Sequence, residues 1–103
     1  MVEVVLFTQP TCSACATQKE RNEGIEEAFP EVTFREVDIR SDLETAEEYG
    51  VRKTPTTLVY ADGERIHEYV GVVERDDLET AIQDANAREE PGVLDRIGAL
   101  VGR

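Results

Sequence analysis

Four short apolar runs, each suited to a β-strand, constrain the fold of this 103-residue chain most strongly. They cover residues 2–7, 31–39, 56–60 and 65–70 and are rich in β-branched and aromatic side chains. Helices are predicted between and after them, over residues 12–29, 41–49 and 74–88. The last two runs flank Asp62-Gly63, a pair that favours a tight hairpin turn.

The order of these elements, β-α-β-α-β-β-α, indicates an α/β fold. Two strands joined through a helix are expected to be parallel with a right-handed crossover, and the hairpin adds an antiparallel pair. We therefore expect a mixed four-stranded sheet with helices on both faces. A chain of this length has room for one such domain, which we expect over residues 1–90.

Local signals set the ends of the predicted helices. Pro30 is expected to end the first helix, and Ser41 followed by Glu44 forms a capping box that opens the second. Gly50 closes that second helix in the left-handed geometry that glycine adopts readily. The third helix has an apolar stripe at helical spacing, formed by Leu78, Ala81, Ile82 and Ala85.

Residues 91–103 are expected to form a short C-terminal helical tail, because Pro91 and Gly92 break the preceding helix. Apolar residues then recur at near-helical spacing, namely Val93, Leu94, Ile97, Leu100 and Val101. So short a helix is marginal alone in water, and its apolar side needs a surface to cover. The tail either folds back onto the domain or docks on a partner or a second copy of the chain.

The charge balance is strongly acidic. Twenty-three acidic residues face eleven basic ones, which gives a formal net charge of -12 and a pI near 4.4. Nucleic acid is disfavoured as a partner, because its phosphates would be repelled. The acidic surface serves solubility or, as we expect, adaptation to a saline cytoplasm in which salt screens the repulsion between carboxylates. The low lysine content, only Lys19 and Lys53, resembles that of proteins from halophilic microbes.

Nothing in the sequence predicts export or membrane insertion. No apolar run of about 18 residues is present, and the N-terminal segment carries Glu3 and Pro10 where a signal peptide needs basic residues and a longer apolar stretch. Two cysteines are few for a secreted domain of this size. We therefore expect a cytoplasmic protein that does not contact a membrane. We also expect it to be a monomer.

Both cysteines, Cys12 and Cys15, lie in the segment TQPTCSACATQ. A structural zinc site usually needs four ligands, and His67 is the only histidine. A structural disulfide that closes so small a loop removes little chain entropy. By contrast, Cys12 begins a predicted helix, where free backbone N–H groups and the helix dipole stabilise a thiolate, and Cys15 lies one turn further on the same face. The position therefore favours a redox-active pair.

Two separated motifs resemble the thioredoxin superfamily: FTQPTCSAC after the first strand, and EEYGVRKTPTTLVYADGERI at residues 47–66. Together they extend the resemblance over residues 2–86, and it is closest to short archaeal thioredoxins and glutaredoxin-like proteins, which also begin at the first active-site strand. The resemblance implies a thioredoxin-like fold and protein-disulfide oxidoreductase activity. It matches Pro55 to the family's cis-proline and Gly71 to a glycine before the last helix.

The same resemblance implies the roles of single residues. Cys12 would be the nucleophile and Cys15 the resolving thiol, with no metal or cofactor. Pro55 would hold Thr54 so that its backbone pairs with an extended substrate segment, and Gly71 would let that segment approach. Pro55 also fits an ordinary strand-start proline, and Gly71 a turn that requires positive φ. The implied partners are disulfide-containing protein substrates and a thioredoxin-reductase-like electron donor.

Several positions depart from the family pattern. The usual tryptophan before the first cysteine is Thr11, and the residues between the cysteines are Ser13 and Ala14, without the common proline. The buried aspartate that often assists proton transfer falls at Leu6. The cation that often follows the second cysteine is replaced by alanine, which leaves Lys19 as the nearest. These departures concern the reduction potential and the proton route rather than the exchange chemistry.

Two alternatives remain open on the sequence. A glutaredoxin-like, glutathione-dependent reductase would need paired glycines and a following aspartate, for which VGVVERDD offers one glycine and Asp76 or Asp77. A cationic cradle for glutathione would rest on Arg52 and Lys53. A binding module that uses the fold for docking, with little redox role, is the other alternative.

Overall fold

The structure is a computed structural model that describes residues 1–89, so the predicted tail lies outside the described residues. The strands are β1 (Val2–Thr8), β2 (Thr33–Asp38), β3 (Thr56–Ala61) and β4 (Glu64–Val70). They form one sheet in the order β2-β1-β3-β4. β1 and β2 are parallel, whereas β3 pairs antiparallel with both β1 and β4. The predicted mixed four-stranded sheet is therefore confirmed.

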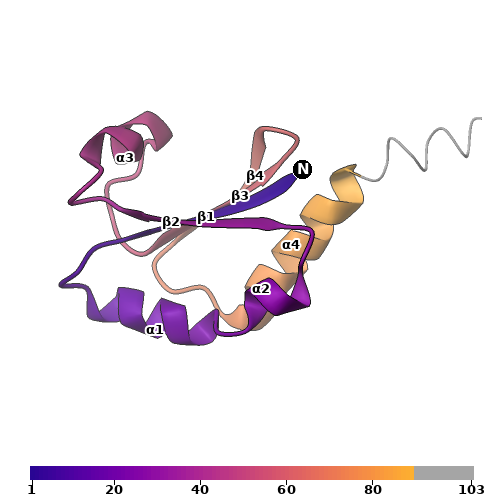
Figure 1. The fold of residues 1–103 in the computed structure, drawn as a ribbon, viewed down its shortest axis with the longest axis horizontal. Coiled ribbons are helices and arrows are strands. Elements are labelled where there is room, and N and C mark those ends of the chain that lie inside the picture. The colour runs from indigo at the N-terminus through magenta and orange to yellow at the C-terminus, as the bar shows by residue number, and fades with distance from the viewer. Residues whose placement is uncertain (90–103) are drawn as a thin grey trace, which may run out of the picture.

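Helices cover both faces of this sheet (Figure 1). They are α1 (Ser13–Arg21), α2 (Ile25–Ala28), α3 (Leu43–Tyr49) and α4 (Arg75–Glu89). α1, α2 and α4 lie on one face and α3 lies on the other, which agrees with the prediction of helices on both faces. Because successive strand residues point to opposite faces, Val4 joins the apolar cluster on the side of α2 and α4, while Val5 and Phe7 join the cluster on the side of α3. Each such buried side chain stabilises the fold by about 1.5–3 kcal/mol.

The predicted third helix and hairpin are confirmed. Leu78, Ala81, Ile82 and Ala85 on α4 are each at most 2% exposed, so the stripe faces the sheet. Asp62 and Gly63 have φ values of 52° and 80°, the left-handed geometry that a two-residue hairpin turn requires. Within residues 1–89, no helix has the length and apolar character needed to span a membrane.

The prediction of one helix over residues 12–29 was wrong. α1 ends at Arg21, and Gly24 then adopts φ 81°, which breaks the helical hydrogen-bond pattern before α2 begins at Ile25. The amide of Asn22 still donates to the carbonyl of Gln18, so the first helix ends in an ordinary cap. The interruption therefore comes from glycine inside the segment and not from Pro30 at its end.

The predicted cap of the second helix was also misplaced by one residue. Asp42, not Ser41, caps α3: its carboxylate accepts from the Thr45 amide at 3.2 Å and from the Thr45 hydroxyl at 2.8 Å. The Ser41 hydroxyl instead donates to the carbonyl of Asp38 at 3.4 Å. Gly50, with φ 72°, closes the helix as predicted.

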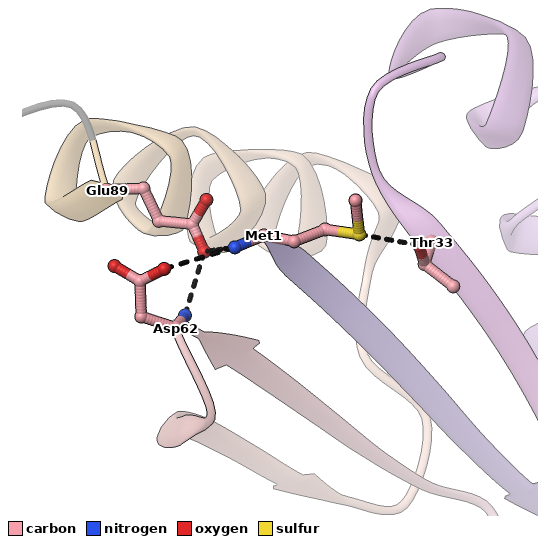
Figure 2. A network of polar contacts seen from close by, with 4 residues as sticks. All are labelled: Met1, Thr33, Asp62 and Glu89. Atoms are coloured by element: carbon pink, nitrogen blue, oxygen red, sulfur yellow. Dashed lines mark hydrogen bonds and ion pairs between the residues drawn. The ribbon is translucent and has the colours of Figure 1, made fainter.

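Polar contacts join the start of β1, the β3–β4 turn and the end of α4, as Figure 2 shows. The amino group of Met1 lies 2.6 Å from the Glu89 carboxylate and 3.1 Å from that of Asp62. The backbone amide of Asp62 donates to the same Glu89 carboxylate at 2.8 Å. On the other side, the Thr33 hydroxyl donates to the Met1 sulfur at 3.5 Å. These contacts lie at the N-terminal end of β1, whereas the cysteines follow its C-terminal end.

Candidate active site

Cys12 and Cys15 form a disulfide at the N-terminus of α1. Cys12 is the N-cap residue, and its Sγ accepts a hydrogen bond from the backbone amide of Cys15 at 3.1 Å. Cys15 is only 2% exposed, whereas Cys12 is partly exposed. A thiolate on Cys12 would therefore meet an N–H donor and the positive end of the helix dipole. Of the two sulfurs, that of Cys12 is the more accessible to another molecule.

The loop before β3 brings Thr54 and Pro55 to this disulfide. The Thr54–Pro55 peptide bond is cis, and Pro55 is buried. The Thr54 hydroxyl donates to Cys12 Sγ at 3.5 Å. Across residues 1–89, no hydrogen bond involves the backbone amide or carbonyl of Thr54. Within this part of the chain, these backbone groups therefore have no partner.

Gly71 completes the group of residues that the sequence singled out. Its amide donates to the carbonyl of Pro55 at 2.8 Å, directly after the end of β4. Its φ of 94° favours glycine. Gly71 therefore also has the structural role considered for it, that of a turn residue with positive φ. A β-carbon at Gly71 would meet no atom within 4 Å, so space is also open beside it.

The sequence placed Gln18 on the inner side of the first helix, but it did not predict the contacts by which Gln9 and Gln18 link these loops. Gln9 Nε2 donates to the Thr54 hydroxyl at 2.9 Å, which links the segment before Cys12 to the cis-proline loop. Gln18 is fully buried, and its side-chain nitrogen and oxygen both form hydrogen bonds with the backbone of Val73. No local pattern signals either contact, because the partners lie 45 and 55 residues apart.

A cavity of about 300 Å³ adjoins the disulfide. Cys12 and Cys15 form part of its wall, and Glu36 and Lys19 form another part. Lys19 Nζ lies 2.7 Å from Glu36 Oε2. The sequence marked Lys19 as the cation nearest the cysteines but gave Glu36 no role in the site.

The structure was also compared with the two other kinds of site considered from the sequence, a metal site and a glutathione site. Among the described residues, no group of three or more histidine, cysteine or acidic side chains is arranged to hold a metal ion. Asp76 and Asp77, the aspartates considered for glutathione, are exposed in the first turn of α4.

Comparisons with known proteins agree with this geometry. The sequence profile of the thioredoxin family matches residues 2–84. The chain is 33% identical to a thioredoxin from Chlamydia trachomatis, over 70% of this chain and 71% of that protein. It is 38% identical to NADPH-dependent thioredoxin reductase 3 from Arabidopsis thaliana, over 69% of this chain, although it spans only 14% of that relative's length.

Solved structures show the same fold. A mutant thioredoxin from Halobacterium salinarum superimposes with a TM-score of 0.75 at 28% sequence identity, over 82% of this chain and 74% of that one. The chain therefore belongs to the thioredoxin family and carries that family's thiol–disulfide oxidoreductase site.

Proposed function

We propose that the protein reduces disulfides in other proteins, with Cys12 as the nucleophile and Cys15 as the resolving thiol. The observation that carries this division of labour is the difference in exposure: Cys12 is partly open at a helix N-cap, whereas Cys15 is 2% exposed one turn inside. The exposed thiolate attacks a substrate disulfide and forms a mixed disulfide. Cys15 then attacks Cys12 Sγ, which releases the reduced substrate and forms the Cys12–Cys15 disulfide.

The substrate in this proposal is an extended segment of a disulfide-containing protein, held by Thr54, Pro55 and Gly71. Among residues 1–89 the backbone groups of Thr54 have no hydrogen-bond partner, which supports this, since an added strand needs such donors and acceptors. Val70 and Val72, on either side of Gly71, are 59% and 39% exposed. Exposed apolar side chains at this position favour contact with a protein surface over contact with glutathione, which is small and polar.

The electrons in this proposal come from a thioredoxin-reductase-like donor. The similarity to part of an Arabidopsis protein named as an NADPH-dependent thioredoxin reductase supports a donor of that class. We further propose that the protein works as a monomer in the cytoplasm. The excess of 23 acidic over 11 basic residues supports a saline cytoplasm, where the repulsion between carboxylates is screened.

Insulin reduction with dithiothreitol as the electron source tests this function. Wild-type protein is expected to accelerate the precipitation of insulin chains, and Cys12→Ser is expected to abolish the acceleration. Cys15→Ser is expected to accumulate a mixed disulfide between Cys12 and insulin, visible by mass spectrometry and reversed by excess dithiothreitol. Full activity in Cys12→Ser, or a trapped species on Cys15 instead, would show that the assignment is wrong.

A further inference from the structure

Glu36 and the buried residue Cys15 both line the cavity beside the disulfide. The cavity, of about 300 Å³, is bounded by the end of β1, the first turns of α1 and one side of β2. Its volume exceeds that of several water molecules, each of which occupies about 30 Å³ in the liquid. Water can therefore link the two groups across it.

The carboxylate of Glu36 is held in place by two neighbours. Lys19 Nζ on α1 lies 2.7 Å from Oε2, and the Thr8 hydroxyl at the end of β1 donates to the same oxygen at 3.1 Å. The contact with Lys19 ties the carboxylate to α1, the helix that follows Cys12 and contains Cys15. The side chains of Glu36 and Lys19 are 48% and 53% exposed, so bulk water also reaches this pair.

The strand register explains why this carboxylate lies where it does. Leu6 on β1 is paired with Glu36 on β2, so the two side chains leave the same face of the sheet. Leu6 is only 7% exposed and apolar, so this position of β1 supplies no carboxylate beneath α1. Both residues also line a larger cavity of about 710 Å³ beneath α1 and α2. The carboxylate on this face comes instead from Glu36, on the neighbouring strand β2.

We propose that Glu36 is the proton acceptor for Cys15 in the second step of disulfide exchange, with Lys19 as a positioning residue. This inference rests on the proposed roles of the two cysteines. The Cys15 thiol gives its proton, through water in the cavity, to the Glu36 carboxylate. The Cys15 thiolate then forms a bond to Cys12 Sγ as the bond between Cys12 and the substrate sulfur breaks. The substrate leaves as a thiolate, the cysteine pair is oxidised by two electrons, and Glu36 returns its proton to solvent or to the departing sulfur.

Other charged groups face the same two cavities and must be distinguished from Glu36. Asp38 lines the smaller cavity, but its Oδ1 accepts from the backbone amide of Arg40 at 2.9 Å, which holds it in the turn after β2. The charged residues of the larger cavity, apart from Lys19 and Glu36, are Glu23, Glu26, Glu27 and Arg35. None of these four lines the cavity that contains the cysteines.

Rapid mixing of the reduced protein with 5,5′-dithiobis(2-nitrobenzoate) separates the two steps, because each releases one coloured thiolate. Cys12 attack produces the first release and Cys15 attack the second. In Glu36→Gln we expect the second release to slow about 100-fold at neutral pH, at the lower end of what general-base catalysis contributes. The difference should narrow as the pH rises, because hydroxide in the solvent can then take the proton from the thiol without Glu36. The rate of the first release should stay within about twofold of wild type, because the donors to Cys12 Sγ are the Cys15 amide and the Thr54 hydroxyl.

Matched variants keep the test specific. Glu20→Gln removes the same charge from the exposed side of α1 and should leave both releases unchanged, while Glu36→Asp should recover part of the second rate. Thermal melts of each variant report whether it is folded. An unchanged pH profile in Glu36→Gln, equal slowing in Glu20→Gln, or a larger loss in Asp38→Asn would overturn the proposal. If the wild type lacked a second release altogether, the proposed function itself would fail, which is a distinguishable result.

Discussion

The Gln18 side chain and the Val73 backbone bind each other in both directions. The Val73 amide donates to Gln18 Oε1 at 2.7 Å, and Gln18 Nε2 donates to the Val73 carbonyl at 3.1 Å. Gln18 lies one turn after Cys15, and Val73 lies two residues after Gly71. The pair therefore fixes the helix that carries the cysteines against the loop that carries the substrate-side glycine.

Gln18→Met should destabilise the protein by about 2–4 kcal/mol, because two buried backbone groups lose their partners while the volume is nearly kept. Urea unfolding followed by circular dichroism measures the change. Asn22→Ala is the matched control, since it removes only the third bond of Gln18, at 3.0 Å, and should cost about 1 kcal/mol or less. Equal stabilities for the two variants would contradict the structural role given to Gln18.

At Thr57 we predict a substitution that raises the stability of the fold. Thr57 is fully buried in β3, and its Oγ1 has no hydrogen-bond partner within the described part of the chain. Thr57→Val replaces that unpaired hydroxyl with a methyl group of similar shape and should stabilise the fold by about 1 kcal/mol. Thermal and urea unfolding check this value. A loss of stability would show that the hydroxyl has a partner in solution.

Asp84 on α4 gives a prediction about pH. Hydrogen bonds from Arg88, and secondarily from His67, lower the pKa of Asp84 below its ordinary value of 3.8. Because the folded-state pKa is depressed, the stabilisation is present above the unfolded-state pKa and is lost as the pH falls through the folded-state value, that is, below about pH 4. Arg88→Met should therefore raise the pKa of Asp84, as measured by NMR titration of its carboxyl carbon. An unchanged pKa would argue against the 2.9 Å Arg88–Asp84 contact in solution.

The acidic composition predicts a response to salt. If the surface is adapted to a saline cytoplasm, repulsion among carboxylates should weaken the fold in dilute buffer and fade as salt is added. Thermal melts should then show a midpoint that rises markedly from dilute buffer to multimolar potassium chloride. Chloride is a better probe than sulfate, because sulfate also strengthens apolar burial. A midpoint that does not respond would leave only solubility as the role of the acidic residues.

The parts of the fold with a strong local signal were predictable from the sequence. The strands and the stripe on α4 follow from side-chain periodicity, and the hairpin follows from Asp62-Gly63. The break at Gly24 was not predicted, because a single glycine inside a helical pattern can stay helical or turn left-handed. Asp42 and Ser41 are both good caps one residue apart, so only the folded backbone shows which of them binds Thr45.

The same distinction applies to the site. Cys12 and Cys15 are close in sequence and carry a recognisable spacing, and Pro55 lies in a second recognisable motif. Gln9 and Glu36 act through contacts across 45 and 28 residues with Thr54 and Thr8. Such contacts depend on the register of β1 with β2 and on the path of the cis-proline loop. A single sequence records neither of these directly.

A thiol titration across a series of glutathione redox buffers tests the central claim most directly, with the fraction of oxidised Cys12–Cys15 measured by mass spectrometry after alkylation. We predict that the pair is half oxidised within a reducing range of roughly -200 to -270 mV. Cys12→Ser and Cys15→Ser should each abolish formation of the intramolecular disulfide. A wild-type pair that stays fully reduced in every buffer would contradict the account and favour a binding module without redox function.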